Sequence, residues 1–138
     1  MRIYILSRNK DLYSTRRLVE EATAKGWEVR VIDYLKCTIE IMKNELVVNY
    51  EGKVLPTPDA IIPRIGASRT FYGAAMVRHF EMIDVFSTTG NLALTRSRDK
   101  LRSLQVLSKN GVDLPRTVFA SNKSNAKDVI ALSGGTPL

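Results

Sequence analysis

The chain has 138 residues, 44% hydrophobic and 25% charged, which is ordinary usage for a folded domain and excludes a disordered protein. No apolar run approaches the roughly 18 residues of a membrane-spanning helix and no signal-peptide pattern is present, so we expect a cytoplasmic protein without membrane contact. The single cysteine, Cys37, excludes an intramolecular disulfide and is interpreted as a small, partly buried hydrophobe rather than a nucleophile.

The net charge of +7 is concentrated in the middle of the sequence. Residues 64–109 contain eight Lys or Arg against three Asp or Glu, whereas residues 1–63 contain ten against nine. Such a concentration favours phosphate groups or acidic chains as partners. The alternative is that these side chains only solvate the exposed faces of helices, and the charge count does not separate the two interpretations.

The N-terminal part of the sequence predicts a βαβ unit followed by a hairpin. A strand, a helix and a second strand are expected in this order: Arg2–Leu6, Tyr13–Lys25 and Glu28–Asp33. Gly26 is the expected stop of the helix. Two further strands, Thr38–Met42 and Glu45–Tyr50, are separated by the two residues 43 and 44, which predicts an antiparallel hairpin insert.

The middle of the chain predicts a buried strand, Ala60–Arg64, and then a long helix over Arg69–Phe86 with Ser68 as its N-cap. Four apolar residues of this helix recur on one face and are expected to pack in the core: Tyr72, Met76, Phe80 and Ile83. The only histidine, His79, lies beside this stripe. Because it has no ligand partner three or four residues away, we assign it no chemistry.

A short strand over Leu92–Leu94 and a helix from Ser97, its N-cap, to about Asn110 are expected next, with Gly111 as the stop. From Val112 the sequence changes character, and a new domain is expected to begin. It predicts a strand and a short helix: Thr117–Ala120 and Asn125–Leu132. The last six residues, SGGTPL, have the pattern of an entry to a further strand, which favours a fragment of a longer protein.

No single motif carries a strong catalytic signal, because GxGxxG, Walker-type and metal-ligand spacings are all missing from the sequence. Two arginine-rich loops, PRIGAS and TRSRDK, follow predicted parallel strands and lead into predicted helices. Ligands bind at that edge of open α/β sheets, and arginine holds carboxylate or phosphate groups in bidentate fashion. Alternatively, Arg64 and Arg98 form ion pairs with one of three nearby carboxylates: Asp59, Asp84 or Asp99.

Three stretches carry a family resemblance: MRIYILSR, PDAIIPRIGASRTFYGAAMVRHFEM and LTRSRDKLRSLQVLSKNGVDLPRT. Together they resemble the N-terminal part of RimK-type α-L-glutamate ligases of the ATP-grasp superfamily. The resemblance implies an α/β fold with a Rossmann-like pre-ATP-grasp domain and a largely parallel sheet over residues 1–94. It further implies that residues 95–138 are the truncated start of an ATP-grasp N-lobe.

The resemblance also implies a function for the full-length parent. Such a ligase uses ATP and magnesium, or manganese, to join glutamate to the acidic C-terminus of a small-subunit ribosomal protein through an acyl-phosphate. By position, Lys100 would bind the ATP phosphates, while Arg64, Gly66 and Arg98 would bind substrate. The family's catalytic and metal-binding residues would follow Leu138, so we expect the fragment to be inactive and to hold no cofactor tightly. A homo-oligomer is compatible with the sequence.

Two alternatives stay open. One is an ATP-grasp ligase that acts on a small metabolite, because the residues that choose the acceptor are not in this sequence. The other is a non-catalytic basic module that binds RNA or the ribosome. RNA-binding proteins stack bases on exposed aromatic side chains, and helical periodicity predicts burial for the aromatics of the basic region: Phe71, Tyr72, Phe80 and Phe86. Direct nucleic-acid binding is therefore disfavoured.

Overall fold

The apolar segment Arg2–Leu6 forms β1, a central strand of a four-stranded parallel sheet in the computed structural model, which describes residues 1–121 and 126–135. The strand order is β2-β1-β6-β7, in which β2 is Glu28–Ile32, β6 is Ala60–Pro63 and β7 is Phe86–Ser87. Every neighbouring pair is parallel. The residues from Ile3 to Leu6 are all buried, as expected for a parallel strand that is covered on both faces.

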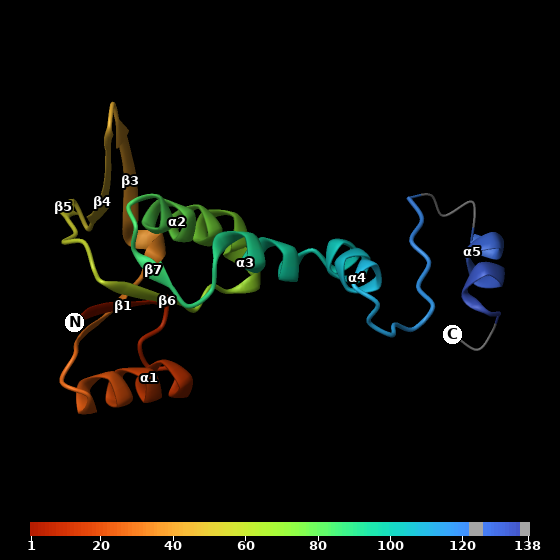
Figure 1. Cartoon of the computed structure of the whole chain (residues 1–138), viewed down its shortest axis with the longest axis horizontal. Helices are drawn as coiled ribbons and strands as arrows, with labels where there is room; N and C mark the ends of the chain where they lie inside the picture. Colours follow the sequence, from red (N-terminus) through yellow and green to blue (C-terminus); the bar gives the residue numbers. More distant parts are fainter. Residues whose placement is uncertain (122–125, 136–138) are drawn as a thin grey trace. The chain divides into compact units, whose positions relative to one another are not determined.

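Helices cover both faces of this sheet. Figure 1 shows α1 (Tyr13–Ala24) on one side and α2 (Thr70–Met82) with α3 (Asn91–Arg98) on the other. The predicted stop of the first helix is confirmed, since Gly26 follows α1 with a φ of 74°, a left-handed conformation that glycine adopts without steric cost. The predicted α/β class with a parallel sheet is thereby confirmed.

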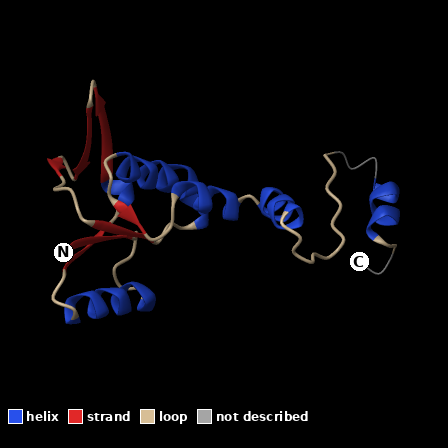
Figure 2. Cartoon of the chain, in the orientation of Figure 1, coloured by secondary structure: helices blue, strands red, loops and turns tan. Residues whose placement is uncertain are grey.

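The predicted hairpin forms a second, antiparallel sheet, drawn as red arrows at the upper left of Figure 2. Its strands are β3 (Cys37–Met42), β4 (Glu45–Tyr50) and a short β5 (Lys53–Val54) that the sequence did not predict. Asn44 has a φ of 63° in the tight turn, a conformation that asparagine tolerates better than most residues. A 3₁₀ turn, η1 (Tyr34–Lys36), leads from β2 into this sheet.

The hydrophobic core lies where α2 covers the parallel sheet and the base of the hairpin. The predicted apolar stripe of α2 is confirmed as packing: Met76 and Phe80 are fully buried, and Tyr72 and Ile83 pack against the same cluster. Two other aromatics of the basic region differ from expectation. The side chains of Phe71 and Phe86 are 90% and 66% exposed, because Phe71 is on the solvent side of α2 and Phe86 is in the edge strand β7.

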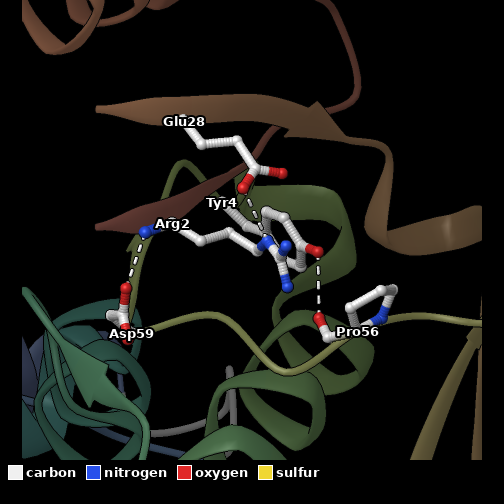
Figure 3. Close-up of polar contacts among 5 residues, drawn as sticks. All are labelled: Arg2, Tyr4, Glu28, Pro56 and Asp59. Atoms are coloured by element: carbon white, nitrogen blue, oxygen red, sulfur yellow. Dashed lines mark hydrogen bonds and ion pairs between the residues drawn. The ribbon is translucent and has the colours of Figure 1, made fainter. Parts of the chain in front are cut away.

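Polar contacts join the strands at the amino edge of the parallel sheet (Figure 3). The backbone N–H of Arg2 donates to Asp59 at 2.6 Å, and its guanidinium pairs with Glu28 at 3.0 Å. The Tyr4 hydroxyl donates to the carbonyl of Pro56 at 2.9 Å. These bonds connect β1 with β2 and with the segment that enters β6. The contacts at the amino edge therefore have a structural role.

The predicted strand Leu92–Leu94 is wrong, because these residues belong to the helix α3. The carboxylate of Glu81 accepts hydrogen bonds from the backbone N–H and the side-chain amide of Asn91, which satisfies the first turn of that helix. Leu94 is buried, whereas Leu92 is exposed, as a helix with one buried face requires. The fourth strand of the sheet is β7 instead, so the predicted helix Arg69–Phe86 ends earlier, at Met82.

Two predicted helix caps are also wrong. Ser68 lies inside the 3₁₀ turn η2 (Ala67–Arg69), so that Arg69 precedes α2 without a side-chain cap. Ser97 lies inside α3, and the next helix, α4 (Lys100–Lys109), is capped by Asp99, whose carboxylate accepts from the N–H of Arg102 at 2.9 Å. Serine and aspartate are both good N-caps, and sequence alone did not choose between them.

The chain divides into two compact units, Met1–Arg98 and Asp99–Leu138. The second contains α4, ended by Gly111 at a φ of 72° as predicted, and α5 (Ala126–Ser133). The predicted strand Thr117–Ala120 is wrong: this segment has no regular secondary structure, since no described strand pairs with it. The helix start at Asn125 and the end of SGGTPL lie outside the described residues. The predicted boundary after residue 94 stays a prediction.

Among the described residues, no helix combines the length and the apolar character that crossing a lipid bilayer requires.

Candidate functional site

The chain leaves the carboxyl ends of β1 and β6 toward opposite faces of the sheet. The loop after β1 leads to α1, and the loop after the neighbouring β6 leads to α2, which covers the other face. Such a point, where adjacent strands connect in opposite directions, opens a crevice in which α/β proteins bind ligands. The PRIGAS loop that the sequence singled out lies at this point.

Arg64 bridges the two loops. Its backbone N–H donates to the carbonyl of Leu6 at 2.9 Å, continuing the pairing of β6 with β1. Its guanidinium donates to the hydroxyl of Ser14, in the first turn of α1, at 2.9 Å. The side chain is therefore oriented across the carboxyl edge, and it remains exposed to solvent.

Arg98 reaches the same loop from the end of α3. Its guanidinium donates to the carbonyl of Ile65, between Arg64 and Gly66, at 2.7 Å. The three residues predicted to bind substrate are thus gathered at the β6–α2 loop. Their grouping has a different origin from the predicted one, because Arg98 is the last residue of the helix α3 and does not follow a strand.

The alternative that Arg64 and Arg98 form ion pairs with nearby aspartates is wrong. Among the described residues, neither Arg64 nor Arg98 pairs with a carboxylate. Asp59 accepts from the backbone of β1, and Asp99 caps α4. Two guanidinium charges at one loop therefore lack acidic partners within the described chain, which favours binding of an anion from outside.

Lys100, the predicted ATP contact, is the first residue of α4 and belongs to the second unit. Its side chain is exposed and has no hydrogen bond or ion pair within the described part of the chain. An ammonium without an internal partner is available to a phosphate group, so the residue fits its predicted role. That role stays a prediction.

A second basic feature, which the sequence did not predict, lies at the carboxyl edge, beside the ends of β1 and β2. A hollow of about 210 Å³ lies there, and it is lined by Ser7, Arg8, Lys10, Val31, Asp33, Lys36 and Tyr50. Lys36 pairs with Glu51 at 2.6 Å, and this hydrogen-bonded pair raises the pKa of the lysine. The available signal was the polar segment SRNKD, residues 7–11, after the first predicted strand, but the residues that complete the hollow are distant in sequence.

Cys37 is buried at the start of β3, as its interpretation as a small hydrophobe requires. Burial, with a smaller contribution from Asp33, raises the pKa of its thiol to about 12. A thiol with so high a pKa is protonated at neutral pH and is a poor nucleophile. Within the described residues, no group of three or more His, Cys, Asp or Glu side chains is arranged to hold a metal ion.

His79 is buried in α2, and its Nε2 has no hydrogen-bond partner among the described residues. Burial lowers its pKa, and a hydrogen bond with the backbone of Val47 acts in the opposite direction. The unfolded chain therefore binds the proton more readily than the folded chain, and stability should fall as the pH drops below the unfolded value of about 6.5.

We expect the urea midpoint of the unmodified chain to be lower at about pH 5.5 than at about pH 7.5. In a His79→Gln variant this pH dependence should be much smaller, whatever its absolute stability. An equal drop in both proteins would assign the effect to other groups.

Comparison with known proteins places these features in context. Residues 1–94 match the model of the RimK PreATP-grasp domain. The chain is 58% identical over 138 residues to a probable alpha-L-glutamate ligase 1 of Pseudoalteromonas atlantica and 57% identical to a probable alpha-L-glutamate ligase of Cellvibrio japonicus. All of the chain is covered in both matches, but only 46% of each relative, so the chain spans about half their length.

Solved structures share the fold at low sequence identity. The ATP-grasp ligase PsnB, complexed with a minimal precursor, matches with a TM-score of 0.68 and 16% identity over 96% of this chain and 50% of its own. The macrocyclase MdnB of Microcystis aeruginosa matches with a TM-score of 0.67 and 15% identity over 95% of this chain and 58% of its own. A RiPP-associated ATP-grasp ligase of Chryseobacterium gregarium, in complex with ADP and a leader and core peptide, matches with a TM-score of 0.59 and 21% identity. This match covers 94% of this chain and 47% of the ligase chain.

Proposed function

This chain belongs to the RimK pre-ATP-grasp domain family, and we propose that it is the N-terminal part of an ATP-dependent ligase that adds glutamate to an acidic peptide. The names of the relatives, probable alpha-L-glutamate ligases, support the donor amino acid. The leader and core peptide bound to the Chryseobacterium gregarium ligase supports a peptide as acceptor. The acceptor that the sequence resemblance implies is the C-terminus of a small-subunit ribosomal protein.

The observation that carries the proposal is the pair of guanidinium groups at the β6–α2 loop. Arg64 and Arg98 are held by a hydroxyl and a carbonyl, which are neutral acceptors, so their charges remain available. A carboxylate of the acceptor would complete this arrangement through charge-assisted hydrogen bonds. Gly66 has open space around its Cα, which lets a peptide backbone approach the loop closely.

ATP, when bound with a divalent metal ion, would supply the phosphoryl group that activates the acceptor carboxylate. Lys100 would bind the nucleotide phosphates through its ammonium. Arg64 and Arg98 would orient the acceptor and offset its negative charge. In this scheme the first unit binds the acceptor, so some of the residues that choose it lie in this chain, contrary to the expectation from the sequence, and the second unit begins the nucleotide site.

Replacement of Arg64 tests the acceptor role in the full-length ligase. We expect Arg64→Gln to raise KM for a peptide ending in two glutamates by roughly twofold to fivefold, with kcat nearly unchanged, because an exposed charged contact is lost. Glutamate addition would be measured by mass spectrometry. Arg78→Gln, an exposed arginine on α2, is the matched control. Equal KM values for the two variants would contradict the role of Arg64.

The same assay separates the alternatives. A ligase for a small metabolite would add glutamate to amino-acid-sized acids at a higher kcat/KM than to the acidic peptide. The exposure of Phe71 and Phe86 removes one argument against RNA binding, so filter binding at two salt concentrations is needed. Tight RNA binding at physiological salt, together with no glutamate addition to any acceptor, would contradict the proposed ligase function. It would favour a non-catalytic RNA-binding module instead.

A further inference from the structure

The hollow at the ends of β1 and β2 lies on the same carboxyl edge as the Arg64 and Arg98 pair. Its cations are Arg8, Lys10 and Lys36, against the single acid Asp33. Glu51 offsets Lys36 in an exposed ion pair, which leaves a surplus of one positive charge. Within the described residues, the side chains of Arg8 and Lys10 have no ion pair or hydrogen bond. These two exposed cations are therefore available to an anion.

The backbone around the hollow argues against a phosphate cradle. Phosphate sites use several neighbouring free backbone N–H groups, yet alternate N–H groups of the β1–α1 loop, those of residues 7, 9 and 11, already have acceptors. The N–H of Ser7 donates to Ile32, that of Asn9 approaches the Ser7 hydroxyl at 3.4 Å, and that of Asp11 donates to the side chain of Asn9 at 2.8 Å. The charged donors are the two flexible side chains of Arg8 and Lys10, which suits a singly charged carboxylate.

The size of the hollow indicates what kind of group it holds. Its volume of about 210 Å³ is below the roughly 300–1,000 Å³ of sites that enclose a whole small molecule. A single acidic side chain of a longer ligand fits this space better than a nucleotide does. The ligand would then continue along the sheet edge.

The strand order indicates that a ligand bound in the hollow would extend along the sheet edge toward Arg64. The hollow is at the ends of β2 and β1, and Arg64 follows β6, which is the next strand in the sheet. Neighbouring strands are about 4.8 Å apart, so the two basic positions are separated by roughly 5–10 Å along the edge. Alternate residues of an extended peptide are roughly 7 Å apart, which matches this spacing.

We infer that the Arg8 and Lys10 hollow is a second acceptor subsite, which binds the side-chain carboxylate of a glutamate or aspartate next to the position bound by Arg64. The acceptor is accordingly an extended peptide with at least two acidic residues that crosses the carboxyl edge of the sheet. This inference rests on the proposed acidic acceptor. It adds a specificity determinant in the first unit, which would bind the acceptor residues that precede the modified C-terminus of the acceptor.

The test is a titration of the 138-residue chain with tetraglutamate, followed by amide chemical shifts in NMR spectra. We expect shifts in the Ser7–Asp11 loop and at residues 33–36, and a half-saturation concentration that rises with salt. The double variant R8Q/K10Q should raise that concentration by roughly threefold to tenfold. The control R78Q/K43Q removes one arginine and one lysine away from the hollow and should leave the half-saturation concentration of tetraglutamate unchanged. Tetraglutamine should produce no shifts in the loop.

Several outcomes would overturn the inference. Loss of affinity of equal size in R8Q/K10Q and in the control would show a general charge effect. Inorganic pyrophosphate that displaces tetraglutamate at a lower concentration would assign the hollow to phosphate chemistry. Shifts confined to residues 64–66 would leave the proposed acceptor in place without the second subsite, whereas loss of the proposed function appears separately, as missing glutamate addition by the full-length ligase.

Discussion

Replacement of Lys100 by alanine in the full-length ligase is expected to lower ATP affinity or turnover by roughly tenfold to a hundredfold. A charge-assisted hydrogen bond to a phosphate contributes about 1.5–3 kcal/mol, and each 1.4 kcal/mol corresponds to about tenfold. Lys100 is exposed and has no side-chain partner among the described residues, so its removal should leave the fold nearly untouched. Isothermal titration with ATP and a thermal melt would measure both effects.

Arg102 provides the matched control for Lys100. It is exposed and carries the same charge two positions further along α4, where a side chain points in a different direction. Specific contact with the phosphates requires a large loss for Lys100→Ala and a small one for Arg102→Ala. Equal losses that shrink together in added salt would indicate a general electrostatic effect and remove Lys100 from the nucleotide site.

Replacement of Gly73 by valine is expected to destabilise the first unit by about 3 kcal/mol, the upper end of the cost of overpacking a core. Gly73 lies buried in α2, where an added Cβ would overlap the buried side chain of Ile65. Ile65 also accepts the hydrogen bond from Arg98, so its displacement would disturb the substrate loop. For a unit of this size the melting temperature should fall by roughly 10–25 °C.

Gly66→Val is the control for this prediction, since it makes the same chemical change in the same neighbourhood. A Cβ at Gly66 meets open space, and its φ of −71° and ψ of 149° are extended values that valine adopts readily. We expect its melting temperature to stay close to that of the unmodified chain. A large loss in Gly66→Val, or none in Gly73→Val, would show that the packing of α2 against the loop is wrongly described.

Much of the fold was accessible from the sequence, because the relevant signals are local. Continuous apolar runs predicted the buried strands β1 and β6, and a two-residue gap predicted the hairpin. The helical stripe of α2 predicted which side chains fill the core. The family was also accessible, since its characteristic stretches are contiguous and long. Each of these signals depends on residues close together along the chain.

What the sequence left undecided depends on contacts between distant residues. Leu92–Leu94 has the composition of a short strand, and only the carboxylate of Glu81, ten positions before Asn91, caps it as a helix. Likewise, Arg98 joins the substrate loop through the carbonyl of Ile65, 33 positions away. The second basic hollow combines residues from three separate segments. Side chains that converge in this way leave no periodic pattern, so the tertiary structure alone decided the arrangement of the site.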